Sequence, residues 1–231
     1  MTVPNGKNAT AGSDSDLRHL TRVRTERSDD SDPEAHPRSK DSDLRHKIIM
    51  HKEVEVKAKL RNPGDFIARL EGIGVKFGPA VNQHDKIFSP KTLESFTTFQ
   101  TGVSFLRIRN QDSTFLLTLK KSELNELEST EIESEISNPE AIEQIITDLG
   151  YKFSVEVRKK RRKANHDEIE LCLDEVEGLG TFIELEKLMS MNADVEAVQA
   201  ELFEFLKQFG VTELDRVTQG YDTLVALAQG K

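Results

Sequence analysis

The sequence contains a single cysteine, Cys172, among 231 residues, together with no tryptophan and only two tyrosines. One cysteine excludes an intramolecular disulfide and any zinc site built from several cysteines. No apolar run approaches the roughly 20 residues that cross a bilayer, and the first residues lack the apolar core of a secretory signal. These absences predict a protein of the reducing cytoplasm that does not enter a membrane.

Basic side chains are outnumbered: Lys and Arg total 32 against 41 Asp and Glu, for a net charge of -9. This acidic balance disfavours non-specific binding to nucleic acid, whose phosphates repel such a chain. Charged residues still make up 32% of the sequence, and the apolar 36%, with 12 Phe, is enough for a core. The length fits one large domain or two small ones.

Residues 1–47 contain almost nothing to bury, so we expect a disordered polyampholyte tail followed by one domain over 48–231. Basic and acidic side chains balance within this tail, which places the whole negative excess in the domain. The segment Asp14–His19 recurs as Asp41–His46. Two copies are too few for a solenoid, and both a duplication in unstructured sequence and a partner-docking motif are left open.

The strand expected over 48–60 sets the pattern for the rest of the chain. Read with a period of two, it places Val54 and Val56 on one face and Glu55 and Lys57 on the other. Seven later segments repeat this alternation and are also predicted strands: 81–88, 103–110, 114–121, 130–137, 151–163, 167–175 and 181–188.

Capping residues mark the helices between these strands. Asn62–Asp65 is typical of a helix start, and we expect Asp65 near the N-cap of a short helix over 66–71. Asn138 and Pro139 open a second helix that Gly150 ends. Two more helices are expected over 194–209 and 221–228, and a long loop or irregular hairpin over 89–102.

Each predicted strand has one apolar and one charged face, and the charges on different strands are complementary in sign. Two architectures satisfy this pattern. In a layered fold the apolar faces pack on helices and the charges contact water. In a closed barrel, helices cover the apolar outside and the charges point into the lumen. The pattern by itself leaves both open.

Charges that point inward can be buried only if they pair with one another or hold a ligand. The basic candidates are Lys57, Arg107, Arg109, Lys120, Lys159 and Arg161. The acidic candidates are Glu53, Glu55, Glu133, Asp174, Glu184 and Glu186. Arginine binds phosphate oxygens bidentately, and clustered carboxylates bind hard cations such as Mg²⁺ or Mn²⁺. The combination suits a polyphosphate bound together with a metal ion.

Two details of this set depend on where each strand sits. Lys59 and Glu131 are expected at the rim of a lumen rather than among its ligands. The phase of the basic run 158–163 is open: Lys159 and Arg161 share one face, and Arg158, Lys160 and Arg162 share the opposite face.

Eight segments occur in a distinctive order: Glu53-Val-Glu-Val-Lys57, Gln83-His-Asp-Lys-Ile-Phe88, Leu106-Arg-Ile-Arg109, Leu119-Lys120, Glu131-Ile-Glu133, Val157-Arg-Lys-Lys-Arg161, Leu173-Asp-Glu-Val176 and Leu179-Gly-Thr-Phe-Ile-Glu-Leu-Glu186. Together they resemble the CYTH superfamily of triphosphate tunnel metalloenzymes, and most nearly its class IV adenylyl cyclase branch. The resemblance covers about residues 50–225. It departs from the family where the usual Asp-x-Tyr-Phe is replaced by Asp85-Lys-Ile-Phe88.

The resemblance implies an α+β protein in which eight antiparallel strands close into a β-barrel, the triphosphate tunnel, flanked by α-helices. It implies metal ligands among Glu53, Glu55, Glu133, Asp174, Glu184 and Glu186. It implies triphosphate ligands among Lys57, Arg107, Arg109, Lys120, Lys159 and Arg161. The implied catalytic residues are Glu53, Glu55 and Lys57, and the implied cofactor is Mg²⁺ or Mn²⁺.

The resulting expectation is a class IV adenylyl cyclase-like enzyme that converts ATP to cyclic AMP and pyrophosphate. The alternative is a triphosphatase that hydrolyses inorganic, thiamine or nucleoside triphosphate in the same lumen. A third reading is a non-catalytic binder of polyphosphate or nucleotide, although anion binding alone does not require so many carboxylates. The expected partner is therefore ATP or another triphosphate, with no nucleic acid and no membrane, and a homodimer is left open.

Overall fold

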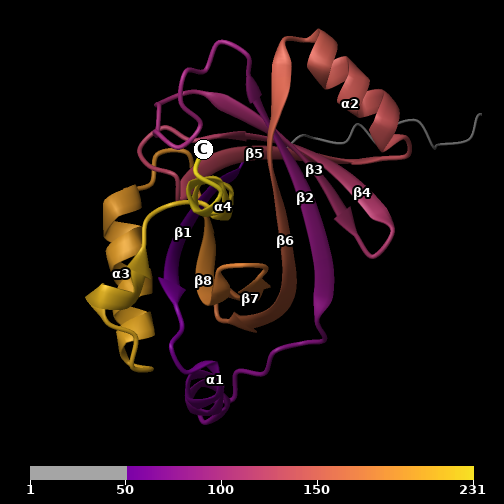
Figure 1. Cartoon of the computed structure of the whole chain (residues 1–231). Coiled ribbons are helices and arrows are strands. Elements are labelled where there is room, and N and C mark those ends of the chain that lie inside the picture. The colour runs from indigo at the N-terminus through magenta and orange to yellow at the C-terminus, as the bar shows by residue number, and fades with distance from the viewer. Residues whose placement is uncertain (1–50) are drawn as a thin grey trace, which may run out of the picture. The chain divides into compact units, whose positions relative to one another are not determined.

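The computed structural model describes residues 51–231, and the expected tail over 1–47 lies outside them. The strands are β1 (His51–Lys59), β2 (Val81–Pro90), β3 (Ser104–Gln111), β4 (Thr114–Lys121), β5 (Glu128–Ile136), β6 (Tyr151–His166), β7 (Ile169–Val176), β8 (Gly180–Met189) and β9 (Arg216–Val217). The helices are α1 (Pro63–Glu71), α2 (Pro139–Asp148), α3 (Val195–Lys207) and α4 (Tyr221–Ala228) (Figure 1). Within 51–231 none of them has both the length and the apolarity to cross a bilayer.

Eight of these strands form a closed antiparallel barrel. Around it they follow the order β1, β5, β4, β3, β2, β6, β7, β8, and β8 pairs with β1 again. One edge of β1 is shared, because β5 pairs with His51–Val54 and the short β9 pairs with Lys57 and Ala58. The predicted α+β barrel is confirmed, and the layered alternative is excluded because pairing of β5 with β1 closes the sheet.

Apolar side chains on the outer face of the barrel pack under helices. One buried cluster joins Val54 of β1 and Leu185 of β8 to Leu202 of α3. Another joins Ile108 of β3 to Ile146 of α2. Figure 1 shows α3 alongside β1 and α2 near the opposite side of the barrel, by β6. The outer surface of the barrel therefore supplies the hydrophobic core, which leaves the inner face free for charges.

Helix α4 packs on the inner face instead of the outer one. Its Tyr221 is buried with Val157 of β6 and Phe182 of β8. By alternation these two residues share the inward faces of their strands with Lys159 and Glu184. Figure 1 shows α4 in the space between β1 and β6. This helix therefore closes part of the lumen.

Helix α1 begins earlier than the expected residues 66–71, within the predicted start segment. Asn62 is the N-cap, and its Oδ1 accepts a hydrogen bond from the backbone N–H of Asp65 at 3.3 Å. The predicted helix start over Asn62–Asp65 is therefore confirmed, with Asn62 and not Asp65 as the capping residue. Pro63 fits the first helical position because its missing N–H would have no partner there. The predicted start of α2 is confirmed, with Asn138 as N-cap followed by Pro139.

Candidate active site

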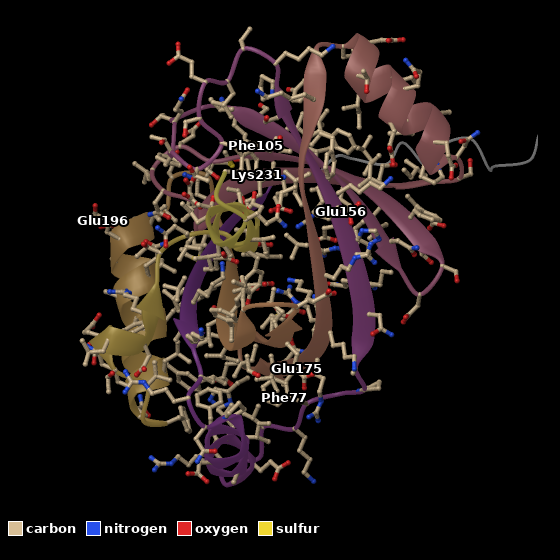
Figure 2. The ribbon with its side chains drawn as sticks, viewed as in Figure 1. Phe77, Phe105, Glu156, Glu175, Glu196 and Lys231 are labelled. Carbon is tan, nitrogen blue, oxygen red and sulfur yellow. The ribbon has the colours of Figure 1, made fainter. Side chains whose placement is uncertain are left out.

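A cavity of about 390 Å³ lies inside the barrel, within the range of roughly 300–1,000 Å³ that small-molecule sites occupy. Figure 2 shows nitrogen- and oxygen-tipped side chains directed into the space that the strands enclose. All but one of the predicted site residues line this cavity: Glu53, Glu55, Lys57, Arg107, Arg109, Lys120, Glu133, Lys159, Arg161, Glu184 and Glu186. The exception is Asp174, which stands opposite Arg161 but is fully buried and does not line the cavity.

The register of the strands explains this gathering. Residues directly opposite one another on antiparallel neighbours point to the same side of the sheet. Lys57 of β1 stands opposite Glu184 of β8, and Glu55 stands opposite Glu186. Alternation then directs all four side chains inward, and a register slip of one residue would turn them out of the lumen.

Three carboxylates on β1 and β8 form the group best suited to a divalent cation. Oxygen atoms of Glu53, Glu55 and Glu186 lie within 4.8 Å of one another, and oxygen donors are the ligands that Mg²⁺ and Mn²⁺ prefer. Burial, followed by repulsion from Glu186 and Glu131, raises the pKa of Glu53 to about 8. Burial and repulsion from Glu184 raise the pKa of Glu186 to about 7. A bound cation would relieve this repulsion.

Arg161 is the centre of a buried network of ion pairs. Its Nε and Nη2 donate to Asp174 at 2.8 and 2.6 Å, and its Nη1 donates to Glu186 at 3.1 Å. Arg161 also donates to Glu184, and Lys159 donates to Asp174 at 3.1 Å. Both oxygens of Asp174 therefore have basic partners, so Asp174 supports Arg161 and Lys159 and is itself covered from the cavity.

Lys57 connects the acidic wall to the C-terminal segment. Its Nζ lies 3.1 Å from Glu184 and 3.5 Å from Glu55, and it donates to the backbone oxygen of Gln219 at 3.0 Å. Burial alone would lower the pKa of Lys57, but Glu184 and Glu55 raise it above its ordinary value. Lys57 therefore stays positively charged although its side chain is only 1% exposed.

The strands β3 and β4 supply the remaining basic groups, and β2 and β5 supply their acidic partners. Arg109 forms a bidentate pair with Asp85, with both distances 2.7 Å. Arg107 donates to Glu131 at 3.3 Å, and Lys120 Nζ lies 3.3 Å from the same carboxylate. Burial would raise the pKa of Glu131, but Lys120 and Arg107 lower it to about 2. These carboxylates therefore hold the basic side chains in place.

Lys59 and Glu131 were both predicted to lie at the rim of the lumen, and the structure agrees for only one of them. Lys59 is exposed, as predicted. Glu131 lines the cavity, so its assignment to the rim is wrong, because its neighbour across the sheet is the inward-facing Lys120. Glu133, a predicted metal ligand, is not part of the carboxylate trio, and its side chain is 42% exposed and accepts a hydrogen bond from Thr118 at 2.7 Å.

The structure also determines the phase of the basic run in β6. Lys159 and Arg161 are buried and line the cavity, whereas Arg158 and Lys160 are exposed. Burial and repulsion from Arg161 lower the pKa of Lys159. The run therefore contributes only every second residue to the cavity.

Sequence reasoning missed several cavity residues, among them Asp85 and Tyr221. Asp85 lies two residues from Ile87 on the inner face of β2 and opposite Arg109. A search for a carboxylate opposite each predicted arginine would have found it. Tyr221 also lines the cavity. Because it lies in a helix, the alternation of side chains along the strands does not predict its position.

Comparison with protein families agrees with this geometry. The CYTH domain model matches residues 51–221, most of the chain. This chain belongs to the CYTH domain family. The CYTH domain is 32% identical over 171 residues to a Methanocaldococcus jannaschii protein named as a candidate adenylate cyclase, covering 73% of this chain and 95% of that one.

Two solved structures share the fold of this CYTH domain. A Pyrococcus horikoshii OT3 protein has 26% identity and a TM-score of 0.61, covering 74% of this chain and 98% of its own. A Hippeastrum protein described as a candidate adenylyl cyclase with a dominant triphosphatase activity has 21% identity and a TM-score of 0.50, covering 79% and 97%. At such identity the second likeness concerns the fold alone.

Raising the pH from about 5 to about 8 is expected to lower the melting temperature of the metal-free CYTH protein. The pKa values of Glu53, about 8, and Glu186, about 7, lie above the ordinary 4.5. A carboxyl with a raised pKa stabilises the fold while protonated, and this contribution is lost as pH rises through the folded pKa. Thermal melts in the presence of a chelator measure how the melting temperature changes with pH.

The Glu53→Gln variant provides the control for this pH dependence, because glutamine does not titrate. Its melting temperature should depend less steeply on pH over the same range. A wild-type melting temperature that rises between these pH values would contradict the assignment.

Proposed function

We propose that this CYTH domain is a cytoplasmic, metal-dependent enzyme that acts on a triphosphate substrate inside its barrel, as a class IV adenylyl cyclase that converts ATP to cyclic AMP and pyrophosphate. One observation carries the proposal. The carboxylate trio of Glu53, Glu55 and Glu186 shares a single cavity with basic side chains on β1, β3, β4 and β6. Oxygen donors for a cation and a basic lining for phosphates are the two requirements of such a substrate.

The donor set of the trio fits Mg²⁺ or Mn²⁺, since all three ligands are carboxylate oxygens within 4.8 Å of one another. Glu53, Glu55 and Glu186 would hold the ion. When bound, it supplies positive charge beside the phosphate oxygens and the attacking oxygen. Glu184 would act differently, because its carboxylate contacts both Lys57 and Arg161, whereas Glu55 and Glu186 each contact one of them.

The basic residues would bind the phosphate chain and neutralise the charge that develops as the bond to phosphorus breaks. Lys57, Lys120 and Arg107 supply positive charge from three strands. Arg109 is held by Asp85 through two hydrogen bonds. Donors fixed in this way need no reorganisation during the reaction, which is where preorganised sites gain most of their rate.

In the cyclase reaction the 3′-hydroxyl of ATP attacks the α-phosphorus and pyrophosphate leaves. In a triphosphatase, water attacks the terminal phosphorus, the remaining diphosphate is the leaving group, and the attacked phosphorus becomes orthophosphate. Both reactions use the same charge distribution and differ in which phosphorus faces the attacking oxygen. The name of the 32% identical relative favours the cyclase. The triphosphatase is the second candidate, because the Hippeastrum protein, which shares this fold, is described as having a dominant triphosphatase activity. One fold can support more than one reaction.

A direct assay separates these candidates. The full chain is incubated with ATP and, separately, with inorganic triphosphate, each with Mg²⁺ or Mn²⁺. Cyclic AMP with pyrophosphate identifies a cyclase, and orthophosphate identifies a triphosphatase. Tight binding of either compound without a product would contradict the enzymatic proposal and leave a polyphosphate or nucleotide binder.

Arg107→Ala is expected to lower kcat/KM for the substrate turned over in that assay by about 10²- to 10³-fold, since one preorganised donor is worth roughly 2.7–4 kcal/mol. Arg107 lines the cavity and contacts Glu131. Steady-state kinetics measure the loss. Arg107→Lys should recover part of kcat/KM, because lysine restores the positive charge but not the guanidinium that binds two oxygens at once.

Arg158→Ala is the matched control for this variant, because the Arg158 side chain is 52% exposed and lies outside the cavity. Its kcat/KM should match the wild type. A near-normal kcat/KM for Arg107→Ala would remove Arg107 from the substrate site.

A further inference from the structure

Tyr221, the first residue of α4, has a hydroxyl that no part of the proposed chemistry uses. The side chain is 7% exposed and lines the cavity. Within residues 51–231 its hydroxyl is buried and has no hydrogen-bond partner. Buried polar groups in native proteins are nearly always paired, and an unpaired one is costly. The unpaired hydroxyl therefore indicates a hydrogen-bond partner that binds in the cavity.

The ring of Tyr221 lies beside two of the candidate phosphate-binding lysines. Lys57 Nζ is 4.3 Å and Lys159 Nζ 4.7 Å from the ring centroid. The ring also meets Phe182 edge to face, at 5.3 Å between centroids. An ammonium group over an aromatic face is attracted by the ring electrons. Tyr221 thus fixes the position of two cations that come from β1 and β6.

The backbone before Tyr221 is tied to the barrel at two points. The backbone oxygen of Gln219 accepts a hydrogen bond from Lys57 at 3.0 Å. The backbone N–H of Gly220 donates to the carboxylate of Glu126 at 2.7 Å. These bonds hold the start of α4 against the cavity wall, so the position of the phenol does not depend on the helix alone.

The phenol remains a neutral donor at physiological pH. Burial raises the pKa of Tyr221 well above its ordinary value, and the carboxylates of Glu184 and Asp174 raise it further. A neutral hydroxyl on a ring that lies next to two ammonium groups is suited to donate to an anionic oxygen that those groups attract.

We propose that Tyr221 binds the phosphate chain of the substrate by donating a hydrogen bond from its hydroxyl, in the part of the cavity that Lys57 and Lys159 line. This inference rests on the proposed triphosphate-binding function. It makes α4 a part of the substrate site and not only a cover for the lumen.

The test compares Tyr221→Phe with the wild-type full chain, using inorganic triphosphate with Mg²⁺ as the probe in calorimetric titrations. Phenylalanine keeps the ring and its packing against Phe182 and removes only the hydroxyl. Loss of one hydrogen bond to a charged group should weaken binding by about tenfold to a hundredfold. The melting temperature should stay the same or rise, because the removed hydroxyl has no partner in 51–231.

The second tyrosine provides a matched control and a spectroscopic readout. Tyr151, in β6, packs beside the cluster under α2, outside the cavity. Tyr151→Phe should bind the probe as the wild type does. Since the chain has no tryptophan and two tyrosines, this variant leaves Tyr221 as the sole phenol. Its near-ultraviolet absorption should change when triphosphate and Mg²⁺ are added.

Several outcomes would overturn the inference. If the wild type and Tyr221→Phe bind triphosphate equally, Tyr221 is not a ligand, although the proposed function stands. If Tyr221→Phe loses affinity only together with thermal stability, its role is packing. An unchanged absorption in Tyr151→Phe on saturation also contradicts the proposal. If the wild type does not bind triphosphate at all, the inference and the proposed function fail together.

Discussion

Replacing Glu55 with glutamine is expected to abolish metal-dependent turnover, with kcat falling by at least about 10³-fold, more than the loss of one neutral donor causes. Glutamine preserves the shape of the side chain but removes one of three charges whose oxygens lie within 4.8 Å of one another. A divalent cation bound by Glu53 and Glu186 alone would be held weakly, because hard cations depend on charged oxygen ligands.

The fold should tolerate this substitution. Burial and repulsion from Glu184 raise the pKa of Glu55, so a neutral residue relieves an unfavourable charge in the metal-free protein. We therefore expect the melting temperature without metal to stay the same or rise. Calorimetric titration with Mn²⁺ should show a large loss of affinity, which separates a ligand from a residue that only shapes the cavity.

The matched control is Glu196→Gln on α3, where the side chain is exposed and lies outside the barrel in Figure 2. Its turnover and metal affinity should equal those of the wild type. Wild-type turnover in Glu55→Gln would remove Glu55 from the mechanism and leave the trio without a role.

Replacing Arg161 with methionine is expected to destabilise the protein by about 3–5 kcal/mol, the usual cost of removing one partner from buried ion pairs. Three carboxylates, on Asp174, Glu184 and Glu186, would lose a cation that contacts each of them. Urea unfolding followed by far-ultraviolet circular dichroism measures the change in the free energy of unfolding. The loss should shrink as pH falls, because protonated carboxyls need no counter-charge.

Arg158→Met tests the same substitution three residues away on the same strand. The Arg158 side chain is 52% exposed and lies 3.1 Å from Glu156, and exposed pairs are worth only about 0–1 kcal/mol. A comparable loss of stability in both variants would show that the basic run acts through its overall charge. It would contradict the central role of Arg161.

The local sequence correctly predicted the strands that carry the site. Alternation over Glu53–Lys57 and Glu184–Glu186 correctly placed each pair of glutamates on one face of its strand, because the direction of side chains in a strand has a period of two residues. The same rule narrowed the basic run 158–163 to two sets of residues. It could not choose between them, because choosing requires knowing which face the barrel turns inward.

The roles of individual acids could not be read in this way. Asp174, Glu133 and Glu186 have the same chemistry in the sequence. In the structure, Asp174 is bound by Arg161 and Lys159, Glu133 is partly exposed, and Glu186 joins the trio. Each difference depends on which basic side chain a neighbouring strand brings within reach, and that is a property of register.

The sequence by itself determined which residues alternate, where the strands and most helices lie, and that charges of both signs would gather on one set of faces. Only the tertiary structure decided that these faces point inward, because that depends on β1 pairing with β5, a strand far from it along the chain. It also brought Tyr221 to the cavity from the far end of the chain. Contacts of this range depend on closure of the whole sheet, which no local period encodes.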